Sequence, residues 1–223
     1  MARERKTARR KISNLLALSL LNLLVERPMY PYEMAATLRQ RGKDEAIKIN
    51  WGSLYTVVQN LEKYGFIEAV DVAREGRQPE RTTYQITNAG REELKDWLRE
   101  LISEPEREYT RFEAALGECA VLPPDELAGL LQRRLDVLDA AIAQHETGLK
   151  GWVTQIPRLF LIESEYHLAL RRAEVEWIRE LLKEFTDGSF PGIREWQHYH
   201  DTGVPPADVL ALVEKNRKEA AGS

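Results

Sequence analysis

The sequence predicts a mainly α-helical protein with one small β-hairpin in its first half, and three observations support this fold class. Apolar residues recur at helical spacing in three short segments before residue 65. The pattern then changes to that of two short strands over residues 66–86. Long helical patterns fill most of the remaining chain, which has 223 residues, enough for one large domain or two ordinary ones.

Three short helices are predicted first. Residues 12–25 are apolar at too many positions for a one-sided surface stripe, which indicates a helix buried on most of its circumference. Residues 31–40 begin with proline, which is favoured at the first position of a helix. The third helix covers residues 51–64, between Asn50 as its amino-terminal cap and Gly65 as its stop. Its inward face is one apolar series: Leu54, Val57, Val58, Leu61 and Tyr64.

A hairpin and a fourth helix complete this domain. Residues 66–72 and 82–86 are predicted strands, and the loop of residues 73–81 between them is polar and basic, with one glycine and one proline. A helix then begins at Asn88 and stops before Pro105. Three short helices followed by a hairpin with a basic tip is the order of a winged helix-turn-helix domain, so we expect a DNA-binding domain with a two-stranded wing.

The second half predicts a separate helical module. From Pro124 to Leu149, seam positions step by four and three residues in a coiled-coil-like pattern that includes His145. Another long helical pattern follows Pro157 and ends at Gly188, which suggests two antiparallel helices. Its shared face is formed by Tyr166, Leu170, Ala173, Trp177, Leu181 and Phe185.

The domain boundaries follow from these patterns. We expect a DNA-binding domain with a basic amino-terminal arm in residues 1–103 and an α-helical dimerisation and effector domain in residues 104–190. Residues 191–223 are rich in glycine and proline, and we expect a mostly irregular tail with a short helix near residues 207–218.

Charge is divided unevenly between the halves. The whole chain carries a formal net charge of -4, which as one number argues against a polyanionic partner. Residues 1–86, however, hold 15 Lys and Arg against 10 Asp and Glu, whereas residues 87–223 hold 17 against 26. The basic excess lies in residues 1–11, and such an arm suits DNA phosphates or serves as a solubilising tail.

Other function classes find little support. The single cysteine, Cys119, excludes an intrachain disulfide and a cysteine cluster for zinc, and it is typical of a reducing compartment. The apolar run of residues 12–25 contains polar residues and is shorter than a membrane span, so we expect a cytoplasmic protein without membrane contact. No phosphate-cradling glycine loop is present, and we predict neither an enzyme nor a cofactor.

The outward face of the helix at residues 51–64 is polar, and we interpret it as a surface for the major groove of double-stranded DNA. Hydroxyl and amide side chains can bond base edges or phosphates, lysine can neutralise a phosphate, and arginines of the hairpin loop suit a minor groove or the backbone. An ordinary solvated helix face is the alternative. The predicted contact residues are Ser53, Tyr55, Thr56, Gln59, Asn60, Lys63, Arg74, Arg77 and Arg81.

Three further features have two interpretations each. Trp97 lies in the apolar stripe of the fourth helix, where packing is the default and a wall of a ligand or dimer cavity for a flat aromatic effector is the alternative. His198 and His200 have the spacing of metal ligands, but a coincidence on the surface is favoured, and no metal is predicted. His145 is interpreted as a polar seam residue, with a pH or ligand role as the lesser option.

Several motifs resemble the PadR family of transcriptional regulators. Gly52-Ser53-Leu54-Tyr55, then residues 60–67, then residues 84–90 occur in family order at family spacing, and the resemblance spans residues 12–102. Residues 109–185 more weakly resemble the helical carboxyl-terminal domain of longer PadR-like regulators, the type also seen in virulence gene activators. One departure is Tyr30-Pro31, where family members often have a glycine after a histidine.

The resemblance implies a homodimeric winged-helix repressor or activator. It implies a recognition helix at residues 51–64 and a wing at residues 67–86, with Tyr55 matching the recognition-helix tyrosine. Dimerisation is implied through the first helix and the carboxyl-terminal helices. For Tyr84 and Thr87 it implies structural roles at the end of the wing.

We therefore expect a sequence-specific transcriptional regulator, a repressor released by a small ligand, that binds a pseudo-palindromic operator as a homodimer. Two alternatives remain open: a winged-helix module that binds a partner protein, and a metal or small-molecule sensor without operator-specific binding.

Overall fold

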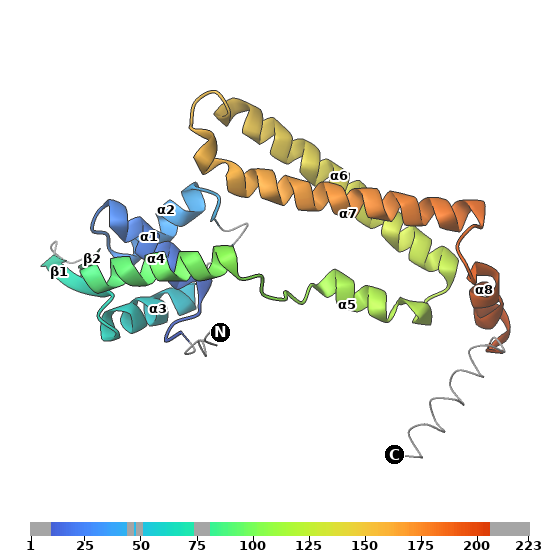
Figure 1. Cartoon of the computed structure of the whole chain (residues 1–223), viewed down its shortest axis with the longest axis horizontal. Coiled ribbons are helices and arrows are strands. Elements are labelled where there is room, and N and C mark those ends of the chain that lie inside the picture. Colours follow the sequence, from blue (N-terminus) through green and yellow to red (C-terminus); the bar gives the residue numbers. More distant parts are fainter. Residues whose placement is uncertain (1–9, 44–46, 48–50, 74–80, 206–223) are drawn as a thin grey trace, which may run out of the picture. The chain divides into compact units, whose positions relative to one another are not determined.

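The computed structural model describes residues 10–43, 47, 51–73 and 81–205 (Figure 1). The chain divides into two compact units, residues 1–108 and 109–223. The boundary expected after residue 103 is the place where helix α4 (Asn88–Ser103) ends, and the residues that follow it up to 110 have no regular structure.

Three helices form the centre of the first unit, as predicted: α1 (Leu15–Glu26), α2 (Pro31–Gln40) and α3 (Trp51–Lys63). The side chain of Asn14 caps α1 by accepting a hydrogen bond from the backbone N–H of Leu16 at 2.9 Å. Helix α1 is buried on most of its circumference, as its dense apolar pattern predicted. Its fully buried leucines are Leu16, Leu20, Leu21, Leu23 and Leu24.

The wing is an antiparallel pair of strands, β1 (Ile67–Ala73) and β2 (Arg81–Ile86), in a register that pairs Ile67 with Ile86. The connection between α1 and α2 adds a further bridge, in which Met29 and Tyr84 exchange both backbone hydrogen bonds at 3.0 Å. The Tyr84 hydroxyl also donates to the carboxylate of Glu62 at 3.5 Å. Burial and this carboxylate together raise the pKa of Tyr84. The base of the wing is thereby tied to the end of α3.

Helix α4 starts against the base of the wing through two close contacts. The Thr87 hydroxyl accepts a hydrogen bond from the backbone N–H of Gly90 at 3.0 Å and donates to the carbonyl oxygen of Gly65 at 2.6 Å. Gly90 packs so closely that a Cβ there would lie 2.0 Å from the carbonyl oxygen of Phe66. The structural role implied for Thr87 is the observed one.

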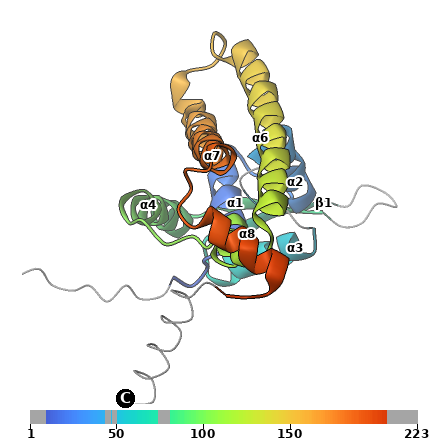
Figure 2. The same cartoon turned by 90° about the vertical axis from the view of Figure 1, so that its right-hand side faces the viewer.

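The second unit is built on an antiparallel pair of long helices, α6 (Pro124–Trp152) and α7 (Ile162–Asp187), which lie side by side in both views (Figures 1 and 2). The single-turn helix η3 (Arg158–Phe160) lies in their connection, and α5 (Arg111–Gly117) and the single turn η2 (Cys119–Val121) precede them. The buried residues between the pair are Leu127, Leu131, Leu135, Val175 and Ile178.

The face expected for α7 is only partly buried. Leu181 and Phe185 pack against the core, but Tyr166, Leu170 and Trp177 are exposed. The residues of α7 that are buried are Leu168, Val175 and Ile178, which at 3.6 residues per turn lie on a different face of the helix from Leu170 and Trp177. The exposed part of the stripe is an apolar surface of this unit, although the Trp177 ring also has an edge-to-face contact with Phe112 at 6.2 Å.

A helix replaces the irregular chain that was expected at the start of residues 191–223. Helix α8 (Ile193–Thr202) begins after Gly192 and ends before Gly203, both with left-handed backbone. Aromatic contacts hold it to the second unit: the Trp196 ring lies 6.0 Å from the Phe185 ring, and its indole N–H donates to the carbonyl oxygen of Ala120 at 3.3 Å. The short helix expected near residues 207–218 lies outside the described residues.

Candidate nucleic-acid interface

Helix α3 has a buried face and a polar face. Leu54, Val57, Val58 and Leu61 are buried in the core of the first unit, as predicted. Tyr64 was predicted on the same face but is 38% exposed, because α3 ends at Lys63 and the chain turns at Gly65 with a positive φ of 73°. The buried face fixes the helix against α1 and α2, so the opposite face is presented to solvent.

The predicted contact residues of α3 lie on this opposite face. Tyr55, Thr56, Gln59 and Lys63 are exposed, and Ser53 and Asn60 are half-buried at its edges. Tyr55 is 55% exposed, which is unusual for a large aromatic side chain on a core helix and leaves both its ring and its hydroxyl accessible. The structure therefore brings together a hydroxyl, an amide, a phenol and an ammonium group on one helix surface.

Sequence reasoning missed Tyr32, which is 60% exposed near the start of α2. Helix α2 packs directly against α3, so the two exposed tyrosines belong to the two helices of one helix-turn-helix. In the sequence, Tyr32 directly follows Pro31 at the start of the helix. The buried residues of this helix are Met34, Ala35 and Leu38, so Tyr32 lies on the outward side.

Of the three arginines predicted to contact DNA from the hairpin, one lies in the described part of the wing. Arg81 is the first residue of β2, and its backbone pairs with Ala73, the last residue of β1. Arg74 and Arg77 lie in the loop outside the described residues.

The basic arm is anchored to the first unit at its last residues. Arg10 hydrogen-bonds Glu93 and Glu100 of α4, and its guanidinium lies 5.2 Å from the centre of the Trp97 ring. Burial by itself lowers the pKa of Arg10, but its hydrogen bonds to Glu100 and Glu93 outweigh that effect, and the pKa is raised. The next residue, Lys11, has its ammonium 5.5 Å from the Tyr64 ring. Arg10 is thus an internal partner of α4 rather than an exposed arm residue.

Trp97 belongs to the core of the first unit. It is 4% exposed and packs within the same apolar cluster as Leu94 and Ile86, beneath Arg10. The packing interpretation accounts for these contacts, and a role for Trp97 in a ligand or dimer cavity stays a prediction.

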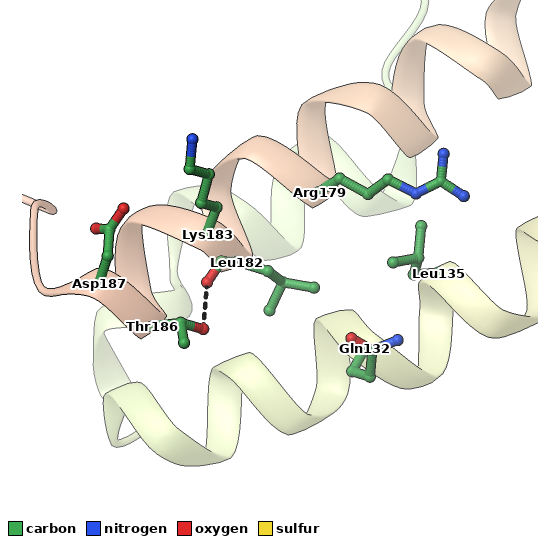
Figure 3. A pocket seen from close by; sticks show the side chains of 7 residues that line it. All are labelled: Gln132, Leu135, Arg179, Leu182, Lys183, Thr186 and Asp187. Carbon is green, nitrogen blue, oxygen red and sulfur yellow. Dashed lines mark hydrogen bonds between the residues drawn. The ribbon is translucent and has the colours of Figure 1, made fainter.

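Shallow hollows lie along the α6 and α7 pair in the described part of the second unit. One, of about 380 Å³, is lined by Gln132 and Leu135 of α6 and by several α7 residues. Figure 3 shows Leu135 and Leu182 directed into the space between the helices, and Lys183 directed away from α6. The other hollow, of about 420 Å³, shares Arg179 with the first. Arg179 is engaged by Asp139, with both carboxylate oxygens within 2.8 Å of one guanidinium nitrogen.

His198 and His200 do not form the metal site that their spacing allowed. They lie two residues apart on helix α8, and residues at this separation point to different sides of a helix. The Nε2 atom of His200 is 3.0 Å from the carbonyl oxygen of Ala120. Within the part of the chain that the structure describes, no group of three or more His, Cys, Asp and Glu side chains is placed to hold a metal ion.

The helices and the wing of the first unit match a known protein family. Residues 20–96, which span α1 to α4 and the wing, match the model of the transcriptional regulator PadR-like family. Over these residues the chain is similar to a PadR-like domain. The resemblance and the winged-helix fold predicted from the sequence are thereby confirmed. No curated protein matches the chain. None of the described helices is long and apolar enough to cross a membrane.

Solved structures of PadR-type regulators share the fold over both units. The Bacillus subtilis PadR structure in complex with operator DNA has a TM-score of 0.63 and 19% identity, and the match covers 77% of this chain and 99% of that chain. The structure of the same protein in complex with p-coumaric acid has a TM-score of 0.66 and 17% identity, and the match covers 78% of this chain and 99% of that chain. The structure of the Vibrio cholerae virulence activator AphA has a TM-score of 0.59 and 19% identity, and the match covers 77% of this chain and 98% of that chain.

Proposed function

We propose that the protein is a transcriptional repressor that binds a pseudo-palindromic DNA operator as a homodimer. The observation that carries this proposal is the polar outer face of α3, with Tyr55, Thr56, Gln59 and Lys63 exposed on a helix whose other face is locked in the core. A helix held in this way fits the major groove, where base edges display distinct patterns of donors and acceptors.

Different side chains of this face have different expected tasks. The Gln59 amide both donates and accepts, so it suits bidentate bonding to one adenine edge, whereas the Lys63 ammonium suits a phosphate and carries no sequence information. In a homodimer, two copies of α3 read half-sites about 34 Å apart, one turn of the duplex. The similarity to a PadR that was solved in complex with operator DNA supports DNA binding by this chain.

Base readout is tested by replacing Gln59 with alanine. Gln59→Ala should weaken binding to the operator roughly fivefold to 150-fold, the value of one good base contact, and leave binding to random DNA unchanged. Lys63→Ala should weaken binding to both DNAs and lower the slope of log affinity against log salt by about one. The matched control is Gln144→Ala, an exposed glutamine of α6 in the other unit.

The measurement is fluorescence anisotropy with the DNA upstream of the protein's own gene, against a scrambled duplex of equal length. Equal losses on both duplexes for Gln59→Ala contradict base readout by α3. If the protein forms no sequence-dependent complex with DNA at moderate salt, the result instead supports the alternative of a winged-helix module that binds a partner protein.

The homodimer is supported by apolar side chains that the single chain leaves exposed. In the first unit these are Leu98, Leu101 and Ile102 at the end of α4, and in the second unit Tyr166, Leu170 and Trp177 on α7. Single exposed apolar residues are ordinary on a protein surface, but a stripe at helical spacing is typical of an interface.

Leu170→Glu tests this interface, because it places a charge in the centre of the α7 stripe. We expect the sedimentation coefficient to fall from that of a dimer toward that of a monomer at micromolar protein. Val121→Glu is the control, since Val121 is also exposed, at 77% against 52% for Leu170, but lies outside the stripe. A dimer of unchanged stability in Leu170→Glu would place the interface elsewhere.

Release from DNA by a small aromatic ligand completes the proposal. The support is the solved PadR complex with p-coumaric acid. Adding p-coumaric acid to the protein on its operator should lower the anisotropy of labelled DNA in a saturable manner. A dose-independent signal would remove this acid as the effector and leave the DNA-binding proposal intact.

A further inference from the structure

Two lysines from distant parts of the sequence meet at one tyrosine ring beside the end of α3. The ammonium group of Lys11, in the segment before α1, lies 5.5 Å from the centre of the Tyr64 ring. The ammonium group of Lys63, the last residue of α3, lies 6.0 Å from the same point. All three side chains are exposed to solvent. These three residues are called the lysine–tyrosine cluster below.

The backbone of Lys11 is held in place on both sides. Before it, Arg10 hydrogen-bonds Glu93 and Glu100 of α4. After it, the side chain of Ile12 is buried in the core of the first unit. A side chain that projects from a fixed backbone loses less conformational entropy on binding than one on a free arm. Lys11 is therefore prepared for a ligand at a defined place on the surface.

The charges of the cluster favour an anion. The electron-rich face of the ring attracts each ammonium group, but the two ammonium groups repel each other. Within the described residues, neither lysine forms an ion pair, and the nearby carboxylate of Glu62 accepts the hydroxyl of Tyr84 instead. The carboxyl end of α3 favours a cation, but Lys63 already supplies one there, so the helix end does not account for Lys11.

We propose that Lys11 and Lys63 together bind the phosphate backbone of double-stranded DNA, and that Tyr64 positions both ammonium groups for this contact. This inference rests on the proposed function and extends its interface from the outer face of α3 to the segment before α1. Lys63 ends the polar face that carries Gln59, so the cluster meets the DNA strand that borders the groove read by this face. Phosphate contacts of this kind fix the position of a recognition helix without reading sequence.

The salt dependence of DNA binding tests the two lysines in the full-length protein. Lys11→Ala should lower the slope of log affinity against log salt by about 0.9 for each half-site, equally on the operator and on a scrambled duplex. Adding Lys63→Ala should double this change. The matched control is Lys95→Ala, an exposed lysine of α4 that removes the same charge from the same unit and should leave the slope unchanged.

The role of Tyr64 is tested by two substitutions that leave both lysines in place. Tyr64→Leu removes the ring and should weaken binding to both duplexes by up to about fivefold, the value of one exposed contact between a cation and an aromatic ring. Tyr64→Phe keeps the ring and should bind like the parent protein. A purely structural tyrosine would instead change the thermal midpoint and leave the affinity of the folded protein unchanged.

The outcomes separate this inference from the proposed function. A slope that stays unchanged in Lys11→Ala overturns the inference, and a parent protein that still prefers the operator then retains the proposed function. Equal changes in Lys11→Ala and Lys95→Ala assign the effect to net charge and also overturn it. A parent protein that binds both duplexes equally refutes operator recognition, but a lower slope in Lys11→Ala still supports the lysine contact. A parent protein that binds neither duplex overturns both.

Discussion

Arg10 provides the sharpest test of how the basic arm is attached. Arg10→Ala removes charged hydrogen bonds to Glu93 and Glu100 and the cation above Trp97. Hydrogen bonds to charged groups contribute about 1.5–3 kcal/mol each when shielded, and partial exposure of the two glutamates lowers this. We expect a loss of about 2 kcal/mol, equivalent to a fall of roughly 8–16 °C in the midpoint of a unit of this size.

The assay is thermal unfolding followed by circular dichroism, with Arg99→Ala as the matched control. Arg99 pairs with Asp96 on the same helix, but both side chains are mostly exposed, so its loss should cost less than about 1 kcal/mol. Arg10→Lys should lie between the two, because an ammonium cannot bond both carboxylates in a fixed fork. The anchoring of Arg10 on α4 would be refuted by two results together. The thermal midpoint of Arg10→Ala would be no lower than that of Arg99→Ala, and the slope of log DNA affinity against log salt would fall by about one, as expected for a phosphate contact.

Two further predictions concern stability. Gly90→Ala should destabilise the first unit by about 3 kcal/mol or more in urea unfolding, because its Cβ would lie 2.0 Å from the Phe66 carbonyl oxygen. The control is Gly129→Ala in α6, where a Cβ meets open space. This substitution should be neutral or stabilise by about 0.5–1 kcal/mol. Equal effects of the two substitutions would contradict the close approach. The hydrogen bond from Arg41 lowers the pKa of Glu26, so the pair stabilises the fold above about pH 4.5 and loses that effect as the pH falls through the lowered pKa. Glu26→Gln should therefore lower the thermal midpoint slightly at pH 7, by an amount equivalent to about 0.2–1 kcal/mol, and this difference should shrink as the pH falls through the lowered pKa of Glu26. A difference that does not shrink with falling pH would exclude the ion pair as its cause.

Local signals were sufficient for the elements of the first unit. Gly65 and the proline that opens α2 mark helix ends by chemistry that acts within a few residues, and the structure places the ends there. Helix α1 was expected from residue 12 but begins at Leu15, after its cap Asn14. The polar face of α3 was equally predictable, because burial of Leu54 and its partners at helical spacing leaves only one side for the rest.

Contacts between distant segments could not be read from the sequence. Nothing near Arg10 indicates that it pairs with residues more than 80 positions away, so its charge counted wrongly toward an exposed arm. Helix α8 was missed for the same reason, since flanking glycines suggested irregular chain while the packing of Trp196 on Phe185 depends on the folded second unit. Sequence spacing drew attention to His198 and His200, whereas the two histidine rings in contact are those of His145 and His167.

The bridge between Met29 and Tyr84 and the hydrogen bond from the Tyr84 hydroxyl to Glu62 hold the wing in a fixed position relative to α3. The outer face of α3 and the wing therefore cannot change their separation independently. On the proposed operator, this separation must match the distance from one groove to its neighbour. Duplexes whose groove width or stiffness departs from that distance must deform to fit, so sequence at positions that no side chain touches should also influence affinity.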